Sequence, residues 1–153
     1  MLAQDIMDTR FRTLQPTDTI AAAVRAFHEV SREQGKKIFG LMVTDAADHL
    51  VGMLSIYDIL LFMQPKHVHI WGEMEDMDFE KLFNDLLKRV KDVPVEDIMT
   101  TDVVTISPTT HLMIISDIMI KKHIRRLPVI AAEQVLGIVY VSDVFHHLLH
   151  RFQ

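Results

Sequence analysis

The chain contains an internal repeat, which limits its possible folds more than any other feature. Asp5-Ile6-Met7 recurs as Asp97-Ile98-Met99, at an offset of 92 residues. Two copies of one unit of about 60 residues explain this pattern better than one irregular domain. The same offset also relates Thr9 to Thr101, Pro16 to Pro108, Thr17 to Thr109, Ile20 to Leu112 and Phe27 to Met119.

The second half of each copy matches in a shifted register, because the first copy is longer between Arg25 and Lys37. Leu41-Met42-Val43 then matches Leu127-Pro128-Val129. The stretch from Gly52 to Asp58 matches the stretch from Gly137 to Asp143. The repeat therefore extends over both ends of each unit.

Each copy is predicted to fold in the order strand, helix, strand, strand, helix. Thr17 or Thr109 is expected to cap the first helix of its copy, and Gly35 to end that helix in the first copy. The predicted strands cover residues 11–14, 38–43 and 50–54, then 103–106, 127–130 and 135–139; the closing helices cover 59–63 and 144–152.

The predicted fold class is α/β, with tandem β-α-β-β-α units related by pseudo-two-fold symmetry and joined by a helical linker. A unit of about 60 residues buries only roughly 60% of its unfolded surface and is marginal alone. The copies are therefore expected to pack on each other, with a small ligand in a cleft between them. The expected boundaries are 1–64 and 93–153 for the two copies and 65–92 for the linker.

The linker contains a predicted amphipathic helix. Acidic residues precede it, and Lys88, Arg89 and Lys91 end it, as the helix dipole favours. The helix either covers the core or contacts a partner, and the aggregation risk of a long exposed apolar stripe favours the first interpretation. Its apolar positions are Phe79, Leu82, Phe83, Leu86, Leu87 and Val90.

Composition excludes several classes of protein. The net charge of -5 gives no reason to expect nucleic-acid or membrane-surface binding. The absence of cysteine excludes disulfides and thiol chemistry. No apolar run approaches the roughly 20 residues of a membrane helix, and the N-terminus shows no secretion signal, so a cytoplasmic protein is expected.

The most informative polar residues lie between a predicted strand and the helix that follows it. Such a junction offers free backbone N–H groups and the positive end of a helix dipole, which favour an anion. Ser55 and Asp58 also match a capping box, which local sequence alone favours over ligand binding. In the second copy Tyr140 replaces the serine while Asp143 remains. Capping therefore explains the pair in the first copy but not the lone aspartate in the second, which favours ligand binding.

With both copies in view, the chain resembles a pair of cystathionine-β-synthase (CBS) domains, the Bateman module. The resemblance rests on Asp-Ile-Met followed by a threonine, on Leu127-Pro128-Val129, and on the Gly-x-x-Ser-x-x-Asp stretch at Gly52 to Asp58. It implies a stand-alone regulatory module that binds an adenosine-containing nucleotide such as AMP, ADP or ATP and signals to a partner. A homodimer with a possible protein target is expected.

The resemblance also assigns roles to individual residues. Asp58 and Asp143 would bind ribose hydroxyls, supported by Ser55 and Ser142. The departure at Tyr140 weakens the second set of contacts. The remaining assignments are Arg125 and Arg126 to phosphate, and Thr9 and Thr101 to the adenine pocket.

Other residue patterns lead to two alternative functions. His146 and His150 lie four apart on a predicted helix beside His147, without a carboxylate partner nearby in the sequence. His67 and His69 lie in the linker, and the acidic residues that follow them are interpreted as a solvated face. We predict no metal site there, although a metal-responsive regulator remains an alternative, as does a ligand-free interaction scaffold. Trp71 is interpreted as a packing anchor for the linker. No catalytic signature is present, so an enzyme is not expected.

Overall fold

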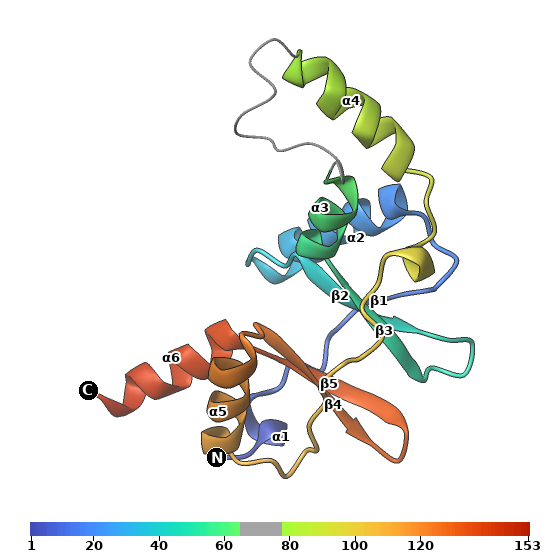
Figure 1. The fold of residues 1–153 in the computed structure, drawn as a ribbon. Helices are drawn as coiled ribbons and strands as arrows, with labels where there is room; N and C mark the ends of the chain where they lie inside the picture. The colour runs from blue at the N-terminus through green and yellow to red at the C-terminus, as the bar shows by residue number, and fades with distance from the viewer. Residues whose placement is uncertain (65–77) are drawn as a thin grey trace. The chain divides into compact units, whose positions relative to one another are not determined.

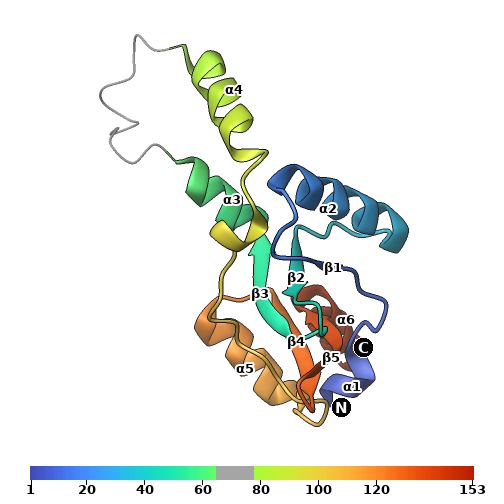
Figure 2. The ribbon, with the colours of Figure 1, turned by 90° about the vertical axis from the view of Figure 1, so that its right-hand side faces the viewer.

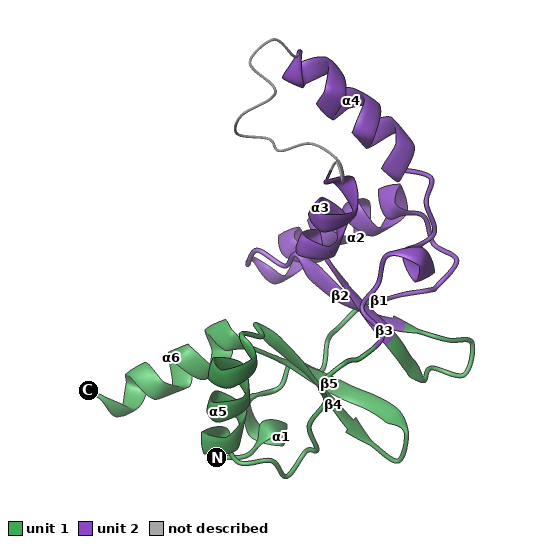
Figure 3. Cartoon of the chain, in the orientation of Figure 1, with its two compact units in different colours: residues 1–13, 44–51, 102–153 green, residues 14–43, 52–101 purple. Residues whose placement is uncertain are grey.

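The computed structural model describes residues 1–64 and 78–153 (Figure 1). The chain forms two compact units, coloured in Figure 3. Unit 1 contains residues 1–13, 44–51 and 102–153, and unit 2 contains residues 14–43 and 52–101. Each unit thus takes chain from both halves of the sequence. The predictions for His67, His69 and Trp71 lie outside the described residues.

Unit 2 contains most of a three-stranded sheet with strand order β1-β2-β3. β2 is buried along its whole length, and α2 buries one face that includes Ile20 and Phe27. In both views α2 and α3 lie next to each other beside this sheet (Figures 1 and 2). The elements are β1 (Thr13–Leu14), α2 (Ile20–Gln34), β2 (Gly40–Thr44), β3 (Leu50–Ser55), α3 (Ile56–Met63), α4 (Phe79–Val90) and a 3-10 turn, η1 (Val95–Asp97).

Unit 1 is built on the antiparallel hairpin of β4 and β5, in which Leu127 pairs with Val139. Ala132 and Glu133 have φ values of 50° and 65°, as a tight hairpin turn requires at both central positions. α1 and α6 contact β5, and α5 packs beside α6. The elements are α1 (Ala3–Ile6), α5 (Leu112–Lys122), β4 (Arg126–Ala131), β5 (Gln134–Tyr140) and α6 (Val141–Arg151).

The Asp-Ile-Met segment of each repeat pairs with a strand from the other repeat. In unit 1 Asp8 forms a β-bridge with Ile138, and in unit 2 Thr100 forms one with Met53. A Cβ atom on Gly137 would lie 2.8 Å from the Asp8 carbonyl oxygen, and one on Gly52 would lie 2.9 Å from the Thr100 carbonyl oxygen. Only glycine allows this approach without displacing backbone, which explains why both copies have it.

The predicted threonine caps are wrong by two residues. Thr19, not Thr17, caps α2, and its Oγ1 accepts from the Ala22 N–H at 3.1 Å. The preceding Pro-Thr pair belongs to a turn that Asp18 closes by accepting from the Gln15 N–H at 2.8 Å. α5 is likewise capped by His111 rather than Thr109, and its Nδ1 accepts from the Met113 N–H at 3.1 Å.

Most other predicted elements are confirmed, with altered ends. Gly35 ends α2 in the left-handed conformation, and the linker helix is α4. α3 and α6 both begin three residues earlier than predicted, at Ile56 and Val141. Residues 103–106 form no strand and contribute only the bridge from Ile106 to Val129. The α/β class is confirmed.

No helix within the described ranges is long and apolar enough to cross a membrane.

Candidate functional site

The first candidate group lies in unit 2, where β3 ends and α3 begins. Ser55 is the N-cap of α3, and its Oγ accepts from the Asp58 N–H at 3.3 Å. Asp58 Oδ2 in turn accepts from the Ser55 N–H at 2.9 Å and from the Ser55 hydroxyl at 3.1 Å. The capping box therefore forms, and it uses one oxygen of the carboxylate.

The second oxygen of Asp58 accepts from a hydroxyl that comes from the other repeat. Thr100 Oγ1 donates to Asp58 Oδ1 at 3.1 Å, and Thr100 is exposed. Thr100 reaches this position because its backbone pairs with Met53 beside Gly52. The cap thus fixes the carboxylate through Oδ2, while Oδ1 faces a hydroxyl donor at the protein surface. We define Ser55, Asp58 and Thr100 as the unit 2 group.

The second candidate group lies at the matching junction of unit 1, between β5 and α6. Tyr140 is the N-cap of α6 but makes no side-chain capping bond. Burial, followed by the negative charge of Asp8, raises the pKa of Tyr140 to about 12, with a smaller contribution from Asp143 in the same direction. The positive charge of Arg126 acts in the opposite sense. We define Asp8, Arg126, Tyr140 and Asp143 as the unit 1 group.

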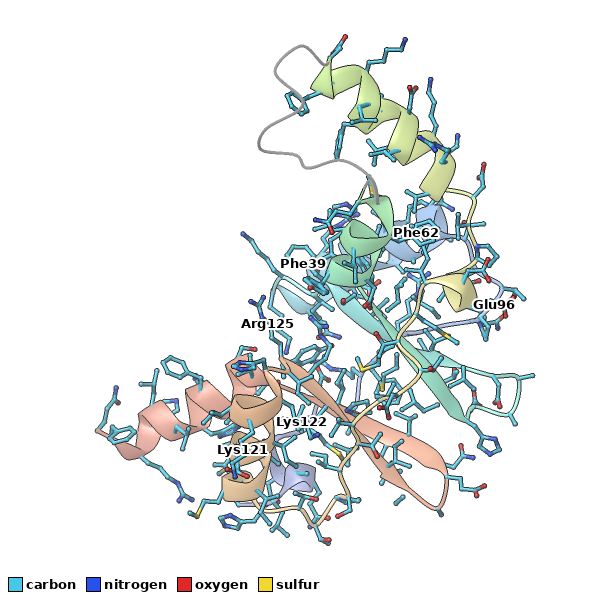
Figure 4. The ribbon with its side chains drawn as sticks, viewed as in Figure 1. Phe39, Phe62, Glu96, Lys121, Lys122 and Arg125 are labelled. Atoms are coloured by element: carbon cyan, nitrogen blue, oxygen red, sulfur yellow. The ribbon has the colours of Figure 1, made fainter. Side chains whose placement is uncertain are left out.

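The two groups also differ in the residue whose backbone carbonyl binds the first N–H of the closing helix. The Phe39 carbonyl accepts from the Ile56 N–H at 2.9 Å, and the Arg125 carbonyl accepts from the Val141 N–H at 2.8 Å. Each bond joins the segment before the first strand of a hairpin to the first residue of the closing helix. Both side chains are exposed (Figure 4). Unit 2 therefore offers an aromatic ring where unit 1 offers a guanidinium group.

The structure divides the predicted site residues between the units. Ser55, Asp58 and Thr101 belong to unit 2, whereas Thr9, Arg125, Arg126, Ser142 and Asp143 belong to unit 1. Thr9 and Thr101 are exposed and directly follow Asp8 and Thr100, and Ser142 is exposed in the first turn of α6. Arg126 pairs with Tyr140 in the β4–β5 register.

Two contacts were missed at the level of sequence. Neither Thr100 nor Asp8 was predicted to contact the aspartate motif, although the offset of 92 residues relates them to each other. That offset is a usable signal, because the two residues form equivalent backbone pairings, Asp8 with Ile138 and Thr100 with Met53. The offset becomes informative only when the Asp-Ile-Met segment of each repeat is known to pair with a strand of the other repeat.

An apolar groove forms a separate feature of unit 2. It has a volume of about 520 Å³ and lies among α2, α3 and α4. Phe83 and Leu87 of α4 line it and are 50% and 40% exposed, and Lys88 and Lys91 are its charged lining residues. An accessible apolar surface of this kind is typical of interaction sites.

Comparison with known proteins places these features in a family. The sequence profile of the CBS domain matches residues 3–65 and 95–150. An uncharacterized 33.4 kDa protein of Thermofilum pendens, from a ribosomal RNA operon, is 25% identical over 150 residues, which cover 95% of this chain and 45% of that protein. The chain thus spans less than half of this relative. An uncharacterized protein of Methanocaldococcus jannaschii is 27% identical, with coverages of 97% and 92%.

Solved structures share the fold over nearly the whole chain. CBSX2 from Arabidopsis thaliana, a CBS-pair protein, superposes with a TM-score of 0.74 at 25% identity, covering 98% of this chain and 95% of that one. A structure of CBSX2 in complex with AMP gives a TM-score of 0.69 at 24% identity, with coverages of 99% and 98%. The chain therefore has the fold of a CBS pair.

Proposed function

Given that this chain belongs to the CBS-domain family, we propose that it is a regulatory module that binds an adenine nucleotide of the AMP, ADP or ATP type. The observation that carries the proposal is the geometry of the unit 2 group. A capping box holds Oδ2 of Asp58 through the Ser55 N–H and hydroxyl, and Oδ1 accepts from an exposed hydroxyl. The likeness to CBSX2, which has been solved with AMP, supports the same ligand class.

The chemistry of ribose suits a carboxylate held in this way. A ribose offers hydroxyl donors, and bonds from neutral donors to a charged acceptor are stronger than those between neutral groups. A fixed carboxylate also loses little conformational freedom on binding. In our proposal a sugar hydroxyl takes over or joins the Thr100 contact on Oδ1, with Ser55 and Thr101 beside it.

We assign phosphate binding to unit 1. Arg125 is exposed, and Arg126 lies opposite Tyr140 in the β4–β5 register. Guanidinium groups bind phosphate by paired hydrogen bonds. In unit 1, Asp143 and Ser142 would contact a sugar, and Thr9 would contact the base. The unit 1 group differs from the unit 2 group because Tyr140 and Asp8 replace Ser55 and Thr100. The proposed role is regulatory rather than catalytic, because no residue set in either group defines a reaction.

The regulatory mechanism that we propose is a population shift. The protein would exchange between two conformations, and a nucleotide would favour the one that it binds more tightly. The size of the shift is set by the difference between its affinities for the two conformations. A protein target would then bind one of these conformations preferentially. The chain spans only 45% of its relative from Thermofilum pendens. Any protein target is therefore part of this proposal.

The test is thermal denaturation with AMP, ADP, ATP, S-adenosylmethionine and NAD. A ligand at 100 times its dissociation constant should add about 2.7 kcal/mol to the free energy of unfolding. We expect a concentration-dependent increase in melting temperature with at least one adenine nucleotide. If no ligand changes it at millimolar concentration, nucleotide binding is excluded as the function.

A second candidate function is an interaction scaffold, in which the groove beside α4 binds a second copy or a protein target. The groove favours this candidate because its lining is almost wholly apolar and accessible. A variant at Asp58 separates the two functions. If the protein is a scaffold, the variant still binds its partner as the unaltered chain does. If the protein is a sensor, the variant no longer responds to nucleotide.

A further inference from the structure

The exposed side of α6 carries two histidines whose rings face each other. His146 and His150 lie one helical turn apart, and their Nε2 atoms are 3.1 Å apart. Their ring centroids are 4.5 Å apart with planes at 90°. Both side chains are exposed. We propose that these two Nε2 atoms bind one divalent transition-metal ion of the Cu²⁺, Ni²⁺ or Zn²⁺ class.

The distance between the two nitrogens fits a shared metal ion. Imidazole nitrogen binds such ions at roughly 2.0–2.1 Å. Two nitrogens 3.1 Å apart and each at that distance from one ion enclose an N–metal–N angle of about 100°. This angle lies between the right angle of square-planar coordination and the tetrahedral angle. The ion can therefore bind without a large change of either side chain.

The backbone holds the two donors in place before the ion arrives. Residues four apart on a helix lie on the same face, and α6 is helical from Val141 to Arg151. His150 lies in the last turn, where the negative end of the helix dipole favours a cation. Arg151 acts against the ion through its positive charge. Because both donors belong to one helix, a bound ion also links two successive turns and stabilises α6.

The site leaves coordination positions open. The described residues contain no group of three or more His, Asp or Glu side chains that could hold a metal. His147 is the nearest further donor, with its ring edge-on to His146 and the centroids 5.8 Å apart. Water or a group from another molecule must complete the coordination. We therefore expect a site that exchanges its metal readily, rather than a closed structural one.

A hydrogen bond between the rings is the competing explanation of the same distance. One neutral imidazole can donate its Nε2–H to the other Nε2, and 3.1 Å suits that bond as well. The two explanations differ in their response to a metal ion. If the two rings only form a hydrogen bond, an added metal ion is not bound by these nitrogens. If the proposed site is present, both imidazoles bind one ion.

The decisive measurement is electron paramagnetic resonance of the full chain, without a histidine tag, after adding one equivalent of Cu²⁺. We expect hyperfine structure from two equivalent nitrogens and a one-to-one stoichiometry in Zn²⁺ and Ni²⁺ titrations. His146→Ala and His150→Ala should each weaken binding at least about tenfold, since even the loss of a supporting residue costs that much at metal sites. His111→Ala, on α5, is the control and should change the affinity little.

Thermal denaturation with Zn²⁺ provides an independent measurement. The metal should raise the melting temperature of the unaltered chain and of His111→Ala, but not that of the His146→Ala, His150→Ala double variant. Equal Cu²⁺ spectra from the unaltered chain and this double variant would overturn the proposal. A large loss with His111→Ala would also overturn it, because the ion would then bind elsewhere.

Discussion

Thr100 donates a hydrogen bond of 3.1 Å to Asp58 across 42 residues of sequence, and so joins the two repeats at a carboxylate. The contact depends on Gly52, since a Cβ there would lie 2.9 Å from the Thr100 carbonyl oxygen. In unit 1 the equivalent of Thr100 is Asp8, whose negative charge acts on Tyr140. A donor in one unit is thus replaced by an acceptor in the other, so the two groups are expected to differ in ligand preference.

Asp58→Asn should abolish most of the nucleotide response. The substitution keeps the side-chain shape but removes the charged acceptor of the Thr100 and Ser55 bonds. A hydrogen bond to a charged group contributes about 1.5–3 kcal/mol, so we expect binding at least roughly tenfold weaker. The readout is the nucleotide-induced change in melting temperature. The weakened cap also lowers stability without ligand, by about 1 kcal/mol.

Asp18→Asn is the matched control for this variant. Asp18 also accepts a backbone N–H three residues away in unit 2, from Gln15 at 2.8 Å, but it lies in the turn before α2. It should lose a similar amount of stability while keeping the full nucleotide response. An unchanged response in Asp58→Asn would remove Asp58 from the proposed site.

Gly52→Ala and Gly137→Ala should each destabilise the fold. The new Cβ atoms would lie 2.9 Å and 2.8 Å from backbone carbonyl oxygens, and such overpacking costs typically about 1–3 kcal/mol. Urea denaturation measures the free energy of unfolding. Gly35→Ala is the comparison, because its Cβ meets nothing within 4 Å and its cost comes only from the left-handed φ, about 1–2 kcal/mol. If the two tight glycines cost less than Gly35, the close approach is not a constraint.

Local sequence rules predicted the features that depend on neighbouring residues. Gly35 ends α2 because glycine accepts the left-handed conformation. Ser55 and Asp58 form the capping box that their spacing predicts. β4 and β5 lie where strands were predicted at residues 127–130 and 135–139, and the tight turn at Ala132 and Glu133 joins them. In each case the interacting atoms lie within a few residues of one another.

Features that depend on residues far apart in the sequence were not predicted. Nothing local to Asp8 or Thr100 shows that each pairs with a strand of the other repeat. The cap of α2 was misplaced because both Thr17 and Thr19 are acceptable N-cap residues, and the turn closed by Asp18 decides between them. His111 is a weak N-cap type by propensity, so the start of α5 follows from its surroundings rather than from its sequence.

Phe83→Glu with Leu87→Glu tests the groove beside α4. Both side chains line the groove, so two charges there should prevent any association that it supports, because an unpaired charge is costly to bury. Light scattering after size-exclusion chromatography measures the mass. Lys81→Ala with Asn84→Glu changes the net charge equally on the same helix, away from the groove lining, and should leave any such association unchanged. Equal masses for both variants would exclude the groove as the contact.

Tyr140 should make the stability of the fold fall at alkaline pH. Its pKa is raised to about 12, from an ordinary value of 10.0, so the folded state keeps the phenol proton when the unfolded state has lost it. The stabilisation is fully present below pH 10 and is lost as pH rises from about 10 through 12. A difference of that size corresponds to about 2–3 kcal/mol.

The Tyr140→Phe variant isolates the contribution of Tyr140 ionisation to the free energy of unfolding. It removes the titrating phenol while keeping the ring, so its free energy of unfolding should change less between pH 9.5 and 12 than that of the unaltered chain. Guanidinium denaturation at each pH measures the difference. Tyr57 is the matched control, because its side chain is 69% exposed, and Tyr57→Phe should keep the alkaline loss. If Tyr140→Phe and the unaltered chain lose stability in parallel, neither the burial of Tyr140 nor the negative charge of Asp8 raises its pKa as described.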